Sequence, residues 1–114
     1  MNEAHFFQAL SDETRLRIIH LLACEKELSV CMLFNALQRS QPRVSRHLAY
    51  LRESGIVQVR RQAQWVFYRL HDDLRPFNRA VLDQLAAGLA PREPYLSDLA
   101  RLRDLRAQGR PCAA

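Results

Sequence analysis

Glycine is scarce in this chain, with three residues in 114. Phosphate-cradling loops and nucleophile elbows both need glycine at fixed positions, so neither is available here. No apolar run is longer than a few residues, which argues against a membrane span. The first residues also lack the basic start and apolar stretch of a signal peptide. We therefore expect a cytoplasmic protein that makes no membrane contact and is not an enzyme.

Cysteine is also rare, because only Cys24, Cys31 and Cys112 are present. An odd count at irregular spacing is not a disulfide framework, and it fits a reducing compartment. The composition is otherwise that of a globular protein, at 48% hydrophobic and 25% charged residues. The length suits one folded domain with a modest core, which we expect over residues 1–109, followed by a flexible tail over residues 110–114.

Lysine is nearly missing, and sixteen of the seventeen basic residues are arginine. Residues 38–69 contain seven arginines and a single acid, Glu53, which gives this segment a charge of +6. The whole chain carries +5, so the remainder carries −1. A block of one sign within a folded segment indicates a polyanionic partner. Arginine suits that partner because its guanidinium makes paired contacts to phosphate and guanine.

Apolar spacing predicts helices on both sides of a short β-structure. A first helix is expected over residues 3–10. Ser11 is a candidate N-cap for the second helix and Ser29 for the third, since serine hydroxyls accept from backbone N–H groups at helix starts. Leu74, Phe77, Val81 and Leu85 predict a fifth helix that ends near Gly88. The sixth should carry the leucine stripe Leu96, Leu99, Leu102 and Leu105.

The stretch "SQPRVSRHLAYLRESG" predicts the fourth helix, with Ser40 as N-cap, Pro42 in the first turn and Gly55 as the stop. Only three residues separate it from the third helix, which is the arrangement of a helix-turn-helix. "IVQVRRQAQWVFYRL" then alternates with period two and predicts a β-hairpin with residues 61–64 at its tip. The predicted fold is mainly α with a small β-hairpin, a winged helix-turn-helix.

A helix of this kind fits the major groove of DNA and reads base edges with its N-terminal residues. Its apolar side should be buried, which leaves the polar side for double-stranded operator DNA. The alternative is a solvated helix beside a solvated hairpin, and His47 in particular could simply complete the helix surface. The predicted DNA-binding residues are Ser40, Gln41, Arg43, Ser45, Arg46 and His47 on the helix and Arg60, Arg61, Gln62 and Gln64 on the hairpin.

The two terminal helices predict a homodimer. Phe6, Phe7 and Leu10 form one apolar face, and the leucine stripe of the sixth helix, with charged residues such as Asp98 and Arg101 around it, forms another. Flanking apolar faces of this kind suit an interface shared between two copies. The alternative is that the leucine stripe closes the core of a single chain.

The segments "ALSDETRLRIIHLL", "SQPRVSRHLAYLRESGIV" and "QWVFYRL" resemble the ArsR family of bacterial metalloregulatory repressors, in particular its arsenic-responsive branch. The resemblance covers about residues 5–72. It implies a dimeric winged-helix repressor, with the first and last helices forming the dimer, that leaves its operator when an effector binds. No cofactor is then required, and trivalent arsenic or antimony is the implied effector.

The resemblance also identifies a departure. Arsenic-responsive members carry Cys-Val-Cys at the start of the helix before the recognition helix, often with a third cysteine one turn later. Here those positions hold Ser29, Cys31 and Phe34. A three-thiolate site would then need Cys31 together with Cys24 and Cys112. The alternatives are that Cys24 is a buried apolar residue and Cys112 a bystander, or that a redox- or persulfide-responsive pair replaces the metalloid site, with Cys31 as the reactive thiol.

Two further interpretations are weaker. A zinc site would need ligands on the last long helix, where Asp83 stands without a histidine, and His71-Asp72-Asp73 is typical of a polar turn. A protein-interaction module that does not bind DNA would use the leucine stripe but would leave the +6 block unexplained. Salt-dependent binding to duplex DNA distinguishes these readings.

Overall fold

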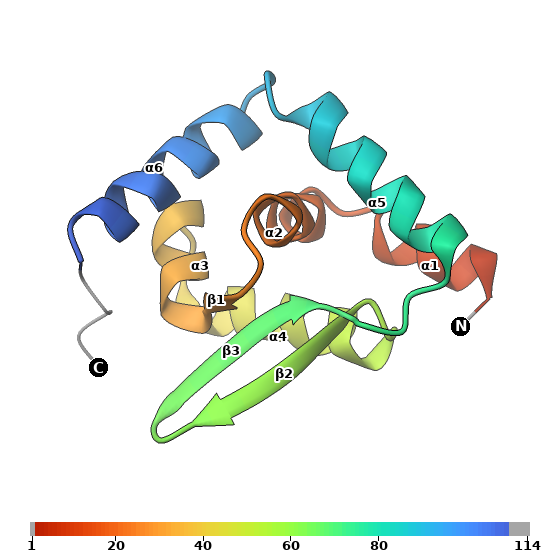
Figure 1. Ribbon diagram of the computed structural model, residues 1–114, viewed down its shortest axis with the longest axis horizontal. Coiled ribbons are helices and arrows are strands. Elements are labelled where there is room, and N and C mark those ends of the chain that lie inside the picture. Colours follow the sequence, from red (N-terminus) through yellow and green to blue (C-terminus); the bar gives the residue numbers. More distant parts are fainter. Residues whose placement is uncertain (1, 110–114) are drawn as a thin grey trace.

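The computed structural model describes residues 2–109 and shows helices arranged around a small antiparallel sheet (Figure 1). The helix-turn-helix and the hairpin follow one another in the predicted order, so the expected winged helix-turn-helix fold is confirmed. The elements in chain order are α1 (Glu3–Ala9), α2 (Glu13–Cys24), β1 (Leu28–Ser29), α3 (Val30–Leu37), α4 (Gln41–Glu53), β2 (Val57–Gln62), β3 (Trp65–Leu70), α5 (Pro76–Leu89) and α6 (Tyr95–Ala107).

The start of α2 differs by one residue from the prediction. Asp12, not Ser11, is the N-cap, and its carboxylate accepts the backbone N–H of Arg15 at 3.0 Å. A carboxylate at this position also interacts favourably with the helix dipole, which a neutral hydroxyl does less well. Ser11 instead donates its hydroxyl to the carbonyl of Gln8 at 2.6 Å and so belongs to the turn after α1.

The helix-turn-helix forms as the sequence predicts. Ser29 caps α3, Ser40 caps α4, and Gly55 follows α4 at a φ of 79°. The turn between the two helices has one feature that the sequence did not indicate: Gln38 adopts a left-handed conformation with φ 54°. Val44, Leu48 and Leu51 are fully buried, which leaves the polar side of α4 outward.

The sheet has three strands in the order β1-β3-β2, all antiparallel. We expected only the hairpin, and β1 is an addition of two residues that pairs Leu28 with Tyr68. The hairpin tip is also tighter than predicted, because Gln62 pairs with Trp65 and only two residues remain between the strands. Residues 61 and 62 therefore belong to β2, where successive side chains point to opposite faces.

Helix α6 packs on α2 and α3 as part of the subunit core, which corrects the expected use of its leucine stripe. Leu102 is fully buried in the main hydrophobic cluster, and Leu99 and Leu105 pack against that cluster. Leu96 alone stays exposed, at 51%. The stripe therefore closes the core, the alternative considered above, because α6 covers the C-terminal half of α3 (Figure 1).

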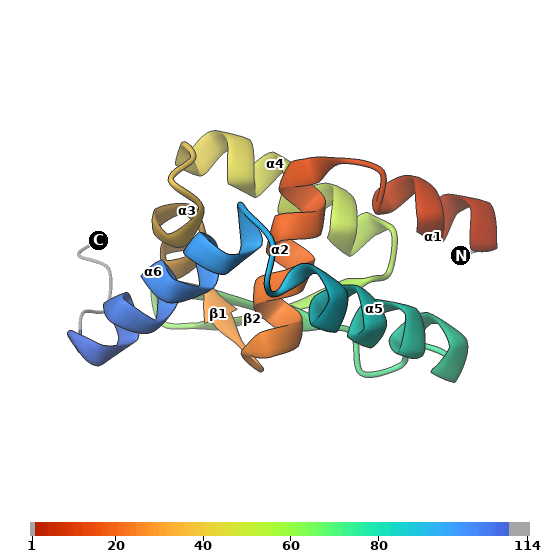
Figure 2. The ribbon, with the colours of Figure 1, turned by 90° about the horizontal axis from the view of Figure 1, so that it is seen from above.

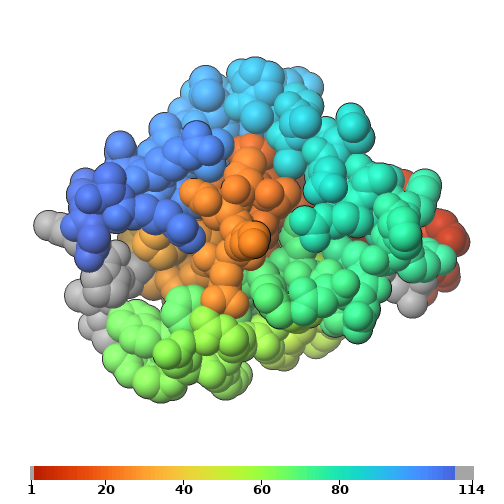
Figure 3. All heavy atoms as spheres, in the orientation of Figure 1, coloured from red at the N-terminus to blue at the C-terminus, as the bar shows by residue number. Residues whose placement is uncertain are grey.

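An exposed apolar face lies instead on α1 and α5, which run along the same side of the molecule (Figure 2). Phe7 of α1 and Phe77 of α5 remain 46% and 54% exposed, and their rings meet edge to face at 6.5 Å. In the space-filling view α5 and α6 flank the end of α2 (Figure 3). Among the described residues, no helix is both long enough and apolar enough to cross a lipid bilayer.

Candidate DNA-binding face

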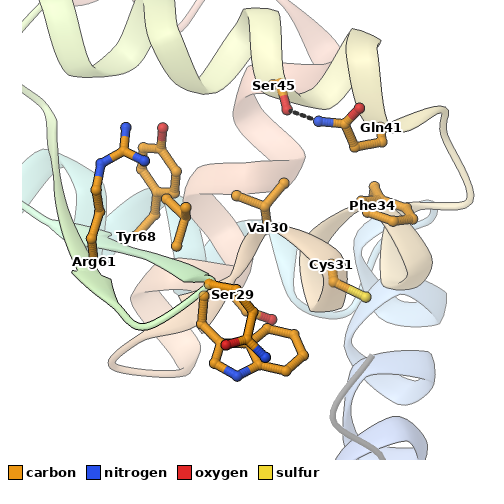
Figure 4. Close-up of a pocket in the computed structure, with 11 residues that line it drawn as sticks. Ser29, Val30, Cys31, Phe34, Gln41, Ser45, Arg61 and Tyr68 are labelled. Carbon is orange, nitrogen blue, oxygen red and sulfur yellow. Dashed lines mark hydrogen bonds between the residues drawn. The ribbon is translucent and has the colours of Figure 1, made fainter. Parts of the chain in front are cut away.

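The first two turns of α4 present the predicted DNA-reading residues on the outer side of the helix. Gln41, Arg43 and Arg46 are exposed and Ser45 is half-buried, because the buried side of the helix is filled by apolar residues. Gln41 donates to the Ser45 hydroxyl at 2.7 Å, which orders one edge of this turn (Figure 4). Exposed guanidinium groups at the N-terminal end of a helix can reach base edges and phosphates.

A hollow of about 570 Å³ separates α4 from the hairpin and from the start of α3 (Figure 4). Gln41 and Ser45 line it on the side of α4, and Arg61 and Gln64 line it on the side of the hairpin. The structure therefore brings these four predicted residues together around one concave surface. An amide and a hydroxyl on the α4 wall and a guanidinium and an amide on the hairpin wall can all hydrogen-bond to a nucleic-acid backbone.

The two neighbouring arginines of β2 lie on opposite faces of the hairpin. Arg61 lines the hollow, whereas Arg60 makes a paired contact with the Glu27 carboxylate at 2.6 and 3.2 Å. Arg60 also lies over the Phe67 ring at 4.7 Å and donates to the Gln62 side chain at 2.7 Å. Arg60 and Gln62 are thus engaged within the subunit and do not share the surface of Arg61.

His47 and Tyr50 pack against the start of α2. The His47 ring lies 3.8 Å from the Asp12 carboxylate and 3.4 Å from Arg15, and the Arg15 guanidinium lies 4.2 Å from the centre of the Tyr50 ring. Burial lowers the pKa of His47, and the nearby arginines lower it further against the opposing charge of Asp12. His47 is therefore mainly neutral near pH 7.

Cys24 and Cys31 lie at the expected ends of α2 and α3. Cys24 is a half-buried free thiol, 3.6 Å from the Nε2 atom of His20, and burial raises its pKa. Cys31 is disulfide-bonded, and its sulfur points away from Arg61 (Figure 4). The predicted contribution of Cys112 lies outside the described residues.

The described part of the chain contains no group of three histidine, cysteine or carboxylate side chains that could hold a metal ion. The trio at residues 71–73 is a polar turn: Asp72 binds Arg69 at 2.7 Å, and His71 accepts the backbone N–H of Asp73 at 3.1 Å. Neither Cys24 nor Cys31 therefore belongs to such a group within residues 2–109. The third thiol of the expected site, Cys112, lies outside the described residues.

A buried charge cluster behind α4 was missed by the sequence reasoning. Asp98 of α6 is fully buried and accepts from Arg17 of α2 at 2.7 and 2.8 Å and from Arg101 at 2.7 Å. Asp98 and Arg17 are 81 residues apart, so no local pattern could pair them. Hydrogen bonding to Asp98 raises the pKa of Arg17.

Comparison with known proteins gives one family match and several relatives. The sequence model described as "Bacterial regulatory protein, arsR family" matches residues 12–59. The arsenic resistance transcriptional regulator ArsR2 of Pseudomonas putida is 47% identical over 106 residues, which span 92% of this chain and 88% of that protein. ArsR1 of the same organism, also named an arsenic resistance transcriptional regulator, is 53% identical over 76 residues, or 67% of this chain. The matched segment spans 59% of the length of ArsR1.

Among solved structures, HlyU from Vibrio cholerae superposes with a TM-score of 0.66 at 37% sequence identity. The superposition covers 74% of this chain and 87% of that one. Fold and sequence thus point to the same group of proteins.

Proposed function

The chain belongs to the ArsR family and is a transcriptional regulator, and on that premise we propose that it is a homodimeric repressor released from its operator by a thiol-reactive effector. Residues 1–109 form its DNA-binding and dimerisation domain, and it acts in the cytoplasm beside its DNA. The effector that the residues and relatives favour is trivalent arsenic or antimony.

The observation that supports DNA binding is the shared concave surface between α4 and the hairpin. Gln41 and Ser45 on one wall face Arg61 and Gln64 on the other, while Arg43 and Arg46 stay exposed beside them. We propose that α4 reads bases in the major groove and that Arg61 and Gln64 hold the adjacent backbone. His47 then packs beside Asp12 and Arg15 at the start of α2, and Arg60 supports the hairpin through Glu27.

The exposed face of α1 and α5 is the surface that we propose for the dimer. Phe7 and Phe77 sit on it, and a shallow apolar hollow along α5 contains Val81, Leu85 and Leu89. Covering half-exposed aromatic side chains with a second copy of the chain buries apolar surface, which stabilises the dimer. A two-fold dimer would place two copies of α4 about 34 Å apart, one turn of DNA.

The effector proposal rests on the position of Cys31 and on the relatives. Cys31 begins the helix that leads through three residues into α4, so a ligand held there would shift α4 if it binds the shifted state better. Two relatives are named as arsenic resistance regulators. Cys31 must first be reduced, and the remaining thiolates would come from Cys24 and Cys112.

Redox control is the second candidate, because Cys31 is disulfide-bonded. Oxidation and reduction at Cys31 would then change α3 without any metalloid. A thiol at the first turn of a helix is favoured as thiolate by the helix dipole, which supports reactivity at this position. The two candidates share Cys31 and differ in what reacts with it.

A mobility-shift titration on the DNA upstream of its own coding region tests both candidates. Reduced wild type should bind, and arsenite or antimonite should release it. Cys31→Ser should bind equally well and ignore arsenite, while Cys24→Ser should respond more weakly if its thiolate is a ligand. Cys112→Ser should likewise respond more weakly if it is a ligand, and release of all three cysteine variants by arsenite would reject thiol sensing. Release of wild type by peroxide or persulfide but not by arsenite would replace metalloid sensing with redox control.

Base reading by α4 has its own test. Arg43→Ala and Arg46→Ala should each weaken operator binding by about 1–3 kcal/mol if the lost contact is a paired one to a base. Both side chains are exposed, so the circular dichroism spectrum should not change. Operator affinity equal to wild type in both variants would remove α4 as the reading helix.

A further inference from the structure

Helix α6 completes the last turn of α3 with charged donors. Arg101 of α6 donates through Nε to the carbonyl of Ala36 at 2.7 Å, and Arg17 of α2 donates to the carbonyl of Leu37 at 2.9 Å. The last carbonyls of a helix have no partner within it, so external donors fix where such a helix ends. Here the two donors come from helices on either side of α3.

A single carboxylate holds both guanidinium groups in place. Asp98 is fully buried, and it receives two hydrogen bonds from Arg17 and one from Arg101, at 2.7–2.8 Å. Paired contacts of this kind fix orientation as well as distance. The end of α3, the middle of α2 and the first turns of α6 are therefore joined at one point.

That point lies directly before the turn that leads into α4. Gln38 and Arg39 are tied back to α3, through backbone bonds to Asn35 and Phe34 at 3.2 Å each. Ser40 follows as the cap of α4. A displacement of the end of α3 is thus passed to α4 through three residues that have little freedom of their own.

The far end of α6 is linked to the hairpin indirectly, through Glu27. Arg106 donates to the backbone carbonyl of Glu27 at 2.9 Å, and the side chain of Glu27 makes the paired contact with Arg60 of β2. The same helix is therefore linked to both parts of the DNA-binding face, to α4 through the end of α3 and to the hairpin through Glu27. Figure 1 shows α6 running beside α3.

We propose that α6 sets the orientation of α4 and of the hairpin for operator DNA, with Asp98 and Arg101 as positioning residues. This inference rests on the proposed function of α4 as the reading helix. It assigns α6 a role within the subunit, distinct from dimerisation, because its contacts reach the ends of elements that face DNA. Arg101 orders α4 without touching DNA itself.

Arg101→Ala is the main test, and Arg103→Ala is its matched control. Both remove one arginine from α6, but Arg103 is exposed, with no hydrogen bond among the described residues. Arg101→Ala should weaken operator binding roughly three- to thirtyfold, the range found for residues that act through a neighbour. Affinity for random-sequence duplex should match that of Arg103→Ala, since both lose the same charge.

Amide hydrogen exchange supplies a readout that does not depend on DNA. In free Arg101→Ala, exchange should quicken at the backbone amides of residues 38–41 while α5 keeps its wild-type protection. Equal operator affinities and equal exchange in the two variants would overturn the inference. Equal losses on operator and random DNA would also overturn it, because the effect would be one of charge. Failure of wild type to prefer operator over random DNA would instead remove the proposed function.

Discussion

Replacing Asp98 with asparagine should destabilise the whole domain, because it removes the only carboxylate that the structure shows facing Arg17 within hydrogen-bonding distance among the described residues. Asparagine keeps the shape of the side chain but carries no charge. It also turns an N–H donor toward a group that is itself a donor. The Arg17 guanidinium, only 3% exposed, would then be a buried charge without a counter-ion.

The magnitude follows from burial. Breaking a buried ion pair by removing one partner costs about 3–5 kcal/mol. Asp98 is fully buried and serves two arginines, so we expect the upper part of that range. A domain is stable by about 5–15 kcal/mol, so Asp98→Asn should remove a third or more of the total. At roughly 4 °C per kcal/mol, a loss of about 4–5 kcal/mol should lower the melting temperature by roughly 16–20 °C.

Urea and thermal unfolding followed by circular dichroism measure the effect. Asp83→Asn is the matched control, since its pair with Arg79 is about half exposed on both sides and should contribute at most about 1 kcal/mol. The double variant Arg17→Met with Asp98→Leu should be more stable than Asp98→Asn, because it leaves no unpaired charge in this place. A cost below about 1 kcal/mol for Asp98→Asn would refute this reasoning about the buried cluster.

Three further predictions concern the hairpin, pH and the dimer. Arg61→Ala should lower the slope of log affinity against log salt by about 0.9 per subunit, as loss of one phosphate contact requires. Arg60→Ala should change this slope less. Equal changes in the two variants would contradict the placement of Arg60 and Arg61 on opposite faces of the hairpin. Burial lowers the pKa of His20 from its ordinary 6.5, so the unfolded chain binds its proton first as pH falls. The free energy of unfolding should therefore decline below about pH 6.5, and urea titrations at several pH values should show a flatter decline for His20→Leu; an unchanged decline would mean that another group is responsible. Phe77→Asp places a charge on the exposed face of α5, and light scattering at micromolar concentration should show a folded monomer, whereas a monomeric wild type would reject the dimer.

Helix starts, the helix-turn-helix and the hairpin could be read from the sequence because their signals are local. Ser29 and Ser40 cap helices through backbone groups three residues away. Val44, Leu48 and Leu51 share one side of α4 by helical spacing alone. The excess of arginine over residues 38–69 also indicated a nucleic-acid partner without any coordinates.

What the tertiary structure alone decided depends on partners distant in the chain. β1 is two residues long and exists because β3, about 40 residues later, supplies its hydrogen bonds. Arg60 and Arg61 look equivalent in sequence, yet the strand turns one toward Glu27 and the other toward the hollow. From the sequence, Asp98 is expected to be a solvated charge beside a leucine stripe. In the folded chain α2 packs against α6, and Asp98 is buried in a pair with Arg17. Local patterns specify which side of a helix is apolar, but whether a given side chain is buried depends on which other element of the fold packs against it.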